Sequence, residues 1–547
     1  MASFIKKIFI YILHFLQKVQ TQFSVGDWSF RLLNRPAHIE KKETTGLIIL
    51  KIDGLGHDQL EKALKKNRLP FIRRIIREGN TSLKKLYSGM PSTTPAVQAE
   101  LFFGVKTSVP AFEFFDRKNA AIVTMYKPHS AHQMAEILEK QGAPLLKGGA
   151  SYSNIYAGGA DEARYCSQTV NMDSILQAAN PFSLLAILFF HTGKILRIIG
   201  YTVFELCLAV IDFFRGIMDR KTVLKELKFI PTRIFICIIL RELIRFRVKI
   251  NITRGVKIIH ASFLGYDEQA HRRGPGSAFA FWTLKGIDDV IKDVYQTANT
   301  SETRKYKLII YSDHGQESVR SYEKCFGKPV QHAVREILSD AHIFSGALGK
   351  NKKRNDFSPL YQRACSLLLK NHRANAGCEK DDSDPEHIQI TTKGPVGHIY
   401  FPMEISGEQT EDIAQKLVET AHIPLVLFIL HDRVVALTSS GKFDLLKQWD
   451  KIFGPDHAHP FPDRVVSDLD LLCRHSHAGD MVISGWTSDS SGLPITFATE
   501  NGAHGGPGKK ETCGFVILTG GISVYKQILR PLDLRKVIIE FLESQTD

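Results

Sequence analysis

The sequence predicts an α/β fold with a core sheet, helices on both faces of that sheet, a helical hydrophobic insertion and a small α+β subdomain. Short apolar runs occupy residues 47–52 (LIILKI), 256–264 (VKIIHASFL) and 307–311 (KLIIY), and each is followed by a helix-like stretch. Runs of this kind are typical of buried parallel strands. Each run ends in polar residues, and ligands of open α/β sheets bind at the carboxyl ends of the strands.

The composition is that of a globular protein, with 44% hydrophobic and 23% charged residues in a chain of 547. This length allows one large α/β domain with insertions, or several modules. We expect the following organisation: 1–25, an amphipathic N-terminal segment; 45–160, the first part of the core; 161–255, a basic and hydrophobic helical insertion; 256–346, the second part of the core; 388–445, the small α+β subdomain; 460–547, the third part of the core.

The positive charge is concentrated in two segments. The formal net charge is +14, and residues 1–25 and 191–257 together supply twelve of these charges. Both segments are also hydrophobic, a combination that favours an anionic membrane surface as the partner. The remainder of the chain is nearly neutral, so we expect no nucleic-acid binding.

Neither segment is apolar over the length of a membrane span. The apolar run at 8–13 is closed by Lys18, and a transmembrane helix needs about 20 apolar residues. We therefore expect a surface helix there, with a helix packed on the protein's own core as the alternative. For residues 181–248, where charges interrupt the apolar stretches, we expect a helical hairpin lying on or dipping into a bilayer. The alternative is a helical cap packed on the main domain.

Six aspartate and histidine residues follow the predicted strands or lie in a glycine-rich loop. They are Asp53, Asp267, His271, Asp313, His314 and His504. Six such ligands suffice for two three-ligand sites with open positions, which are typical of catalytic metal centres. Two divalent ions at such sites can stabilise the attacking and leaving oxygens of a phosphoryl displacement. Imidazole with carboxylate favours zinc, with manganese or iron as alternatives. The eight cysteines form no C-x-x-C pair, which argues against a thiolate zinc site.

The segment GMPSTTPAVQ offers a hydroxyl nucleophile. Ser92, Thr93 and Thr94 precede Pro95, and proline is common at the first position of a helix, so we expect Thr94 to be the N-cap residue. A hydroxyl beside a metal ion could be activated without a separate base.

Five motifs together resemble the alkaline phosphatase superfamily, specifically its type I phosphodiesterase and nucleotide pyrophosphatase branch. The motifs KIDGLG, PSTTP, YDEQAHRRGPGS, YSDHGQ and GAHGG occur in the order of that family. The resemblance implies one metal ion held by Asp267, His271 and His504. It implies a second held by Asp53, Asp313 and His314, with Thr94 beside it as nucleophile and further ligand. Thr94 is followed by Pro-Ala-Val-Gln, whereas nucleotide pyrophosphatases usually have Phe-Pro-Asn there.

These features predict a membrane-associated, metal-dependent phosphodiesterase or phosphatase. We expect two divalent ions, zinc or manganese, a phosphothreonine intermediate on Thr94, and a lipid-derived or membrane-delivered phosphoester as substrate. A phosphomutase or phosphotransferase of the same superfamily is one alternative. A catalytically inactive membrane-binding module is another, although the complete ligand set argues against it. A sulfatase is disfavoured because PSTTP lacks the C/S-x-P-x-R pattern.

Overall fold

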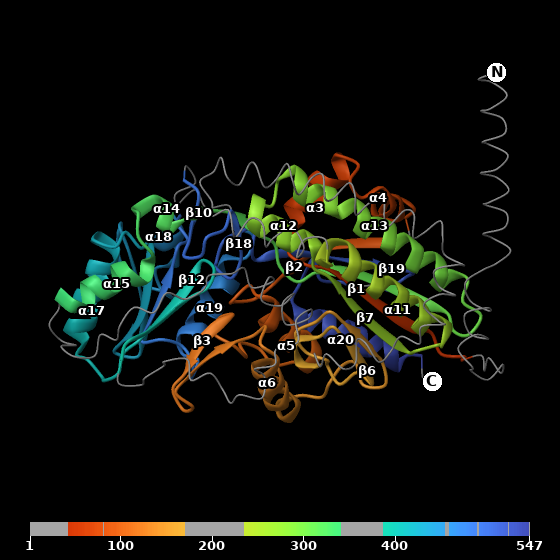
Figure 1. Cartoon of the computed structure of the whole chain (residues 1–547), viewed down its shortest axis with the longest axis horizontal. Helices are drawn as coiled ribbons and strands as arrows, with labels where there is room; N and C mark the ends of the chain where they lie inside the picture. Colours follow the sequence, from red (N-terminus) through yellow and green to blue (C-terminus); the bar gives the residue numbers. More distant parts are fainter. Residues whose placement is uncertain are drawn as a thin grey trace, which may run out of the picture.

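A mixed eight-stranded sheet forms the centre of the molecule (Figure 1). The computed structural model describes residues 42–79, 81–169, 235–340, 387–454, 459–488, 492–522 and 524–545. The three predicted strands are present as β1 (Gly46–Ile52), β7 (Ile258–Phe263) and β8 (Tyr306–Ser312). β1 lies between β7 and β8 and is parallel to both, which brings the carboxyl ends of all three strands to one edge.

The strand order of this sheet is β20-β2-β19-β8-β1-β7-β5-β6. β19 is antiparallel to both of its neighbours, and the other pairings are parallel. The remaining strands are β2 (Thr81–Tyr87), β5 (Ala150–Tyr152), β6 (Glu162–Arg164), β19 (Cys513–Thr519) and β20 (Ile528–Leu529). β6 lies within the range expected for the insertion, so the core sheet extends into that range.

Helices cover both faces of the sheet, because alternate side chains of its strands point to opposite sides. On β1, Ile48 and Leu50 belong to one hydrophobic cluster and Leu47 and Ile49 to the other. The first face carries α3 (His57–Lys65), α4 (Pro70–Arg77), the π-helix Phe235–Leu240, α11 (Arg241–Thr253), α12 (Gly265–Arg273) and α13 (Ala278–Asn299). The second face carries α5 (Thr94–Phe103), α6 (Pro128–Gln141) and α20 (Pro531–Glu543). This confirms the predicted fold class.

A second sheet has six antiparallel strands in the order β11-β12-β16-β13-β14-β15. Its strands are β11 (Gln389–Thr392), β12 (Val396–Tyr400), β13 (Leu425–Leu430), β14 (Arg433–Thr438), β15 (Gly441–Asp444) and β16 (Met481–Ser484). Helices α15 (Val330–Asp340) and α17 (Gly407–Glu419) pack on one face, and α18 (Trp449–Phe453) and α19 (Pro462–Cys473) on the other. Because β16 lies between β12 and β13, this sheet extends past residue 445 of the expected subdomain.

Short elements connect the two sheets. They are the hairpin of β3 (Glu113–Asp116) and β4 (Ala121–Thr124), the pair β9 (Glu317–Ser318) with β18 (Gly502–Ala503), the pair β10 (Arg320–Ser321) with β17 (Ile495–Thr496), and the helix α14 (Tyr322–Phe326). The 3₁₀ turn Ser167–Thr169 lies elsewhere, beside α6.

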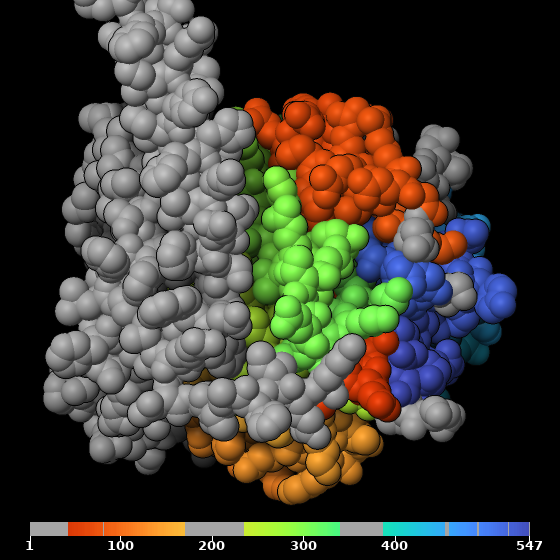
Figure 2. Space-filling model, turned by 90° about the vertical axis from the view of Figure 1, so that its right-hand side faces the viewer, coloured from red at the N-terminus to blue at the C-terminus, as the bar shows by residue number. Residues whose placement is uncertain are grey.

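The C-terminal end of the expected insertion packs on the core. Ile244 and Val248 of α11 are buried in the same cluster as the sheet. Arg245 and Lys249 of this helix both form ion pairs with Asp293 of α13, at 2.6 Å and 2.9 Å. For this part of the chain the structure therefore has a helix packed on the main domain, one of the two expected arrangements. Figure 2 shows one face of the molecule, on which green atoms from the range 235–340 lie beside red atoms of the first described segment and blue atoms of the C-terminal part of the core.

The other hydrophobic and basic stretches, including residues 1–25 and most of 181–248, lie outside the described residues. Among the helices that the structure does describe, none combines the length and the apolar character needed to cross a bilayer.

Candidate metal centre

The expected ligands meet at the edge where β1, β7 and β8 end. Asp53 directly follows β1, and Asp313 and His314 directly follow β8. Asp267 and His271 lie one turn apart on α12, which begins two residues after β7. His504 follows the short strand β18, so five separate segments contribute to one site once Thr94 on α5 is included.

Asp53, Asp313 and His314 form one ligand group. Their nearest ligand atoms all lie within 4.8 Å of one another. The Nε2 atom of His314 is 3.7 Å from Asp53 Oδ1 and 3.7 Å from Asp313 Oδ2. All three residues are buried, with Asp313 and His314 fully inaccessible to solvent.

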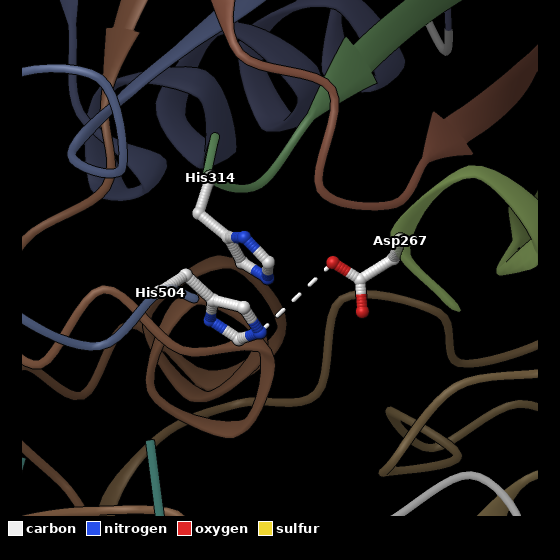
Figure 3. A group of neighbouring side chains, drawn as sticks. All are labelled: Asp267, His314 and His504. Atoms are coloured by element: carbon white, nitrogen blue, oxygen red, sulfur yellow. Dashed lines mark ion pairs between the residues drawn. The ribbon is translucent and has the colours of Figure 1, made fainter. Parts of the chain in front are cut away.

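Asp267, His314 and His504 form a second group, whose nearest ligand atoms also lie within 4.8 Å of one another (Figure 3). His504 Nε2 lies 3.9 Å from Asp267 Oδ1, and the ring of His504 stacks on that of His314 with centroids 3.7 Å apart. His271 adjoins this group, since its Nε2 atom is 3.3 Å from Asp267 Oδ2. The structure thus brings all six expected Asp and His ligands together, with His314 placed between the two groups.

The three histidine rings are oriented in the same way, through a contact of Nδ1 with an acceptor. In each ring the Nδ1 atom lies against an acceptor that is not one of the six expected ligands: Gly315 O at 3.0 Å from His314, Ser92 O at 2.9 Å from His504, and Glu500 Oε2 at 2.8 Å from His271. An Nδ1–H that donates to such an acceptor leaves Nε2 with a free lone pair. Metal-ligating histidines characteristically have an outer partner of this kind.

Gly54 allows the two ligand groups to approach. A Cβ atom at this position would lie 2.1 Å from Asp267 Oδ1, and the residue has a φ of +70°, which favours glycine. The glycine of the Asp53-Gly54 pair is therefore required sterically by the carboxylate that enters from α12. Gln316 holds the same carboxylate through a bond from its Nε2 to Asp267 Oδ1 at 2.5 Å.

The electrostatics of the site indicate a need for cations. Burial, together with the nearby Asp313 carboxylate, raises the pKa of Asp53 to about 7. Burial and the neighbouring His314 lower the pKa of His504 to about 3. The pKa of Asp267 is lowered although burial opposes this, because His271 and His504 lie beside it. Burial opposes the charged form of His271, but the carboxylates of Asp267 and Glu500 raise its pKa well above the ordinary value. Buried carboxylates and imidazoles gathered in this way are the groups that divalent ions bind in their deprotonated forms.

Thr94 and Thr93 have different surroundings. The hydroxyl of Thr94 lies 3.3 Å from Asp53 Oδ1 and 3.2 Å from His314 Nε2. Thr93 contacts neither ligand in the hydrogen bonds of the described residues, and its hydroxyl is buried without a partner there. Thr93 and not Thr94 is the N-cap residue of α5, because the Thr93 carbonyl accepts the first helical bond from Val97. The expected cap position was thus wrong by one residue, and Thr94 is the first residue inside the helix.

Three further residues complete the site and were not among the expected ones. The Lys51 ammonium contacts both Asp53 and Asp313, Glu500 holds His271, and Gln316 holds Asp267. Lys51 and Gln316 lie within the motifs KIDGLG and YSDHGQ, and Glu500 lies two residues before GAHGG. Asp313, Asp267 and His271, which these residues contact, come from other segments, so the sequence alone does not reveal the contacts.

The residues present fit a pair of divalent ions. Asp313 Oδ1 is buried and has no hydrogen-bond partner among the described residues, so it remains available to a cation. The donors are carboxylate oxygens and imidazole nitrogens, a set that suits zinc and manganese.

The family comparison supports the resemblance inferred from the motifs. The family model described as type I phosphodiesterase/nucleotide pyrophosphatase matches residues 244–439. The predicted resemblance is confirmed. The matched segment contains four of the six candidate ligands, Asp267, His271, Asp313 and His314. With this match the chain is a hydrolase of phosphoester bonds. None of the curated proteins matches the chain.

Several solved structures resemble this chain over most of its length, at low sequence identity. An inactive variant of murine ectonucleotide pyrophosphatase/phosphodiesterase 5 in complex with AMP is 12% identical, with a TM-score of 0.45 over 91% of this chain and 95% of that one. Phosphonoacetate hydrolase from Sinorhizobium meliloti 1021 in complex with phosphonoacetate is 12% identical, with a TM-score of 0.46 over 92% and 96%. Human ectonucleotide pyrophosphatase/phosphodiesterase 5 is 12% identical, with a TM-score of 0.43 over 91% and 95%.

Proposed function

We propose that this protein is a metal-dependent phosphodiesterase or phosphatase that uses two divalent ions, zinc or manganese, and the Thr94 hydroxyl as nucleophile. The observation that carries the proposal is the position of this hydroxyl, 3.3 Å from Asp53 Oδ1 and 3.2 Å from His314 Nε2. A hydroxyl in contact with two candidate ligands is placed where activation by a cation is effective.

Asp53, Asp313 and His314 would hold one ion, and Asp267, His271 and His504 the other. Bound there, the ions would supply positive charge to the phosphoryl oxygens and to the attacking and leaving oxygens. Asp53 Oδ1 accepts the hydroxyl hydrogen of Thr94 and so fixes the direction of the hydroxyl. The first turn of α5 adds the positive end of its dipole at the position of Thr94.

Hydrolysis would proceed in two displacements. In the first, the Thr94 oxygen forms a bond to phosphorus while the bond to the leaving alcohol breaks. This leaves a phosphothreonine. In the second, water forms the new bond to phosphorus, the bond to Thr94 breaks, and phosphate or a phosphomonoester is released.

Two measurements on the purified chain test this proposal. Elemental analysis after reconstitution with zinc or manganese should find about two ions per chain, and occupancy near zero would overturn the metal-dependent function. Hydrolysis of matched aryl phosphomonoesters and phosphodiesters by the same sample then separates a phosphatase from a phosphodiesterase. If turnover requires a second alcohol as acceptor, the enzyme is a phosphotransferase instead.

We further propose that the protein associates with anionic membranes and acts on a lipid-derived or membrane-delivered phosphoester. The support is the sequence: twelve of the fourteen net positive charges lie in the hydrophobic segments 1–25 and 191–257. Basic residues near an anionic surface contribute about 1 kcal/mol each, and apolar side chains add burial in the interface.

A further inference from the structure

Lys51 is a buried lysine inside the candidate metal centre. It lies near the carboxyl end of the central strand β1, where it pairs in register with Ser262 of β7 and Tyr311 of β8. Its side chain is fully inaccessible to solvent. A lysine in this position needs counter-charges, because an unpaired buried ammonium is strongly unfavourable.

The counter-charges are two of the candidate ligands. Lys51 Nζ lies 2.7 Å from Asp313 Oδ2 and 3.1 Å from Asp53 Oδ1. Each carboxylate therefore gives one oxygen to the ammonium. The other oxygen of Asp313 has no hydrogen-bond partner among the described residues. Asp313 Oδ2 and Asp53 Oδ1, which contact the ammonium, are also the oxygens that lie 3.7 Å from His314 Nε2, so the ammonium lies at atoms that a metal ion in this site would use.

From this geometry we infer that Lys51 is a positioning residue that lowers the affinity of the Asp53–Asp313–His314 site for its divalent ion. Two carboxylates give that site a formal charge of −2, and the ammonium reduces it to −1. The site of Asp267, His271 and His504 has one carboxylate and thus also carries −1. Lys51 would therefore equalise the charge that the two ions experience.

A purely structural function for Lys51 makes the opposite prediction. If the lysine only holds Asp53 and Asp313 in place, removing it would disorder the ligands and weaken metal binding. If it acts as a competing cation, removing it would strengthen binding, since two unneutralised carboxylates attract a divalent ion more strongly. The direction of the change in affinity distinguishes the two, and this inference rests on the metal centre proposed above.

The experiment compares His504→Ala with the double variant His504→Ala/Lys51→Met. The His504 substitution disables the other site, so that a zinc titration against a chromophoric chelator reports on Asp53, Asp313 and His314. Methionine approximates the length of the lysine side chain without its charge. We expect the double variant to bind zinc at least about tenfold more tightly, and Lys249→Met, which removes a lysine paired with Asp293, to leave the affinity unchanged.

Thermal unfolding provides a second readout in the otherwise unmodified protein. Lys51→Met should lower the melting temperature of the metal-free form and should enlarge the rise in melting temperature on zinc addition. Zinc affinity that is unchanged or weaker in the double variant overturns the inference while leaving the metal centre in place. Absence of zinc binding in both His504→Ala and the unmodified protein overturns the inference and the metal centre together. Should the double variant fail to fold, Lys51→Gln in the same background replaces it, with the same expected direction.

Discussion

The Oγ1 atom of Thr94 lies 3.2 Å from the Nε2 atom of His314, the residue that belongs to both groups of candidate ligands. The hydroxyl at the start of α5 thus points to the centre of the site, and the neighbouring Thr93 hydroxyl does not make this contact. The start of α5 and the end of β8 both have to form for this relationship to exist, and the ring of His504 stacks on His314 beside it. A nucleophile placed in this way can be separated experimentally from the ligands around it.

Thr94→Ala should reduce turnover by about a thousandfold or more, because it removes the attacking oxygen. Both metal ions should remain, since the six Asp and His ligands are unchanged. Steady-state kinetics and elemental analysis on the same preparation measure the two effects. Thr93→Ala is the matched control and should retain most of the activity. If Thr93→Ala abolishes turnover and Thr94→Ala does not, the nucleophile is assigned to the wrong threonine.

Glu500→Gln should weaken the site of Asp267, His271 and His504 by roughly 10- to 100-fold in metal affinity. The carboxylate of Glu500 lies 2.8 Å from Nδ1 of His271 and is itself held by the Thr496 hydroxyl at 2.7 Å. Glutamine keeps the size of the side chain but loses the charge that favours the orientation and basicity of the imidazole. Zinc titration measures the effect, and Glu419→Gln on the exposed surface of α17 is the control. Equal affinities in the two variants would mean that Gly502 O alone suffices to orient His271.

The sequence predicted the central part of the fold and the meeting of the six candidate ligands at one edge, because both follow from where the apolar strands end. Buried parallel strands are apolar throughout, so β1, β7 and β8 were recognisable, and the residues that follow such strands necessarily meet at one edge. The contacts of Lys51 were not predictable in this way. Its partner Asp313 is 262 positions away, and a lysine at the end of an apolar run is more often solvated or ion-paired at the surface. Glu500 was missed for the same reason, because its partner lies 229 positions away.

The ion pairs that basic residues of α11 form with Asp293 could not be predicted from the sequence either, because this partner comes from another segment. Composition counts Arg245 and Lys249 as part of a positive segment, but both form ion pairs with Asp293 of α13 within the fold, and Arg245 also pairs with Glu242. Arg254 likewise pairs with Glu162 of β6 at 3.0 Å. A net charge summed over a segment therefore overstates the charge that this part of it presents to a partner.

Glu511 should make the stability of the metal-free protein depend on pH. Its side chain is buried and accepts hydrogen bonds from the backbone of Gly506 and Gly508, in the loop that carries His504. Burial and the nearby Glu317 raise the pKa of Glu511 to about 8. Because the carboxyl is protonated in the folded state and ionised in the unfolded chain between its ordinary pKa and about 8, its contribution to stability is present at low pH. That contribution is lost as the pH rises through this window.

Glu511→Gln removes this dependence and keeps one of the two acceptor oxygens that bind the backbone of Gly506 and Gly508, so it lowers stability by an amount that does not vary with pH. Relative to the unmodified protein, the variant should gain up to about 1.4 kcal/mol of unfolding free energy per pH unit between pH 5 and 7.5. Urea unfolding in the presence of a chelator at several pH values measures the difference. Glu408→Gln, an exposed residue on α17, should show no such trend. A constant difference between Glu511→Gln and the unmodified protein across this range would contradict the raised pKa.

Membrane association is expected from the segments 1–25 and 181–230, and not from the described part of α11. Intact protein should float with phosphatidylserine-containing vesicles at low salt and less so at high salt, because the Debye length shortens. Deletion of residues 1–25 should weaken flotation, and replacement of 181–230 by a short polar linker should nearly abolish it. The replacement has to end before Phe235, since Ile236 and Leu240 are buried in the core cluster and their loss would unfold the domain.

The ion-paired residues of α11 supply the matched control for this experiment. Arg245→Gln/Lys249→Gln removes two positive charges, as Lys6→Gln/Lys7→Gln does. The charges of Arg245 and Lys249, however, already form ion pairs with Asp293. We therefore expect flotation to be unchanged in Arg245→Gln/Lys249→Gln and reduced in Lys6→Gln/Lys7→Gln. Recovery of the intact protein wholly in the unbound fraction at low salt would show that neither hydrophobic segment engages a bilayer. Association that persists at high salt and after alkaline washing would mean that apolar insertion and not surface charge holds the protein, because only the electrostatic part of the binding is screened.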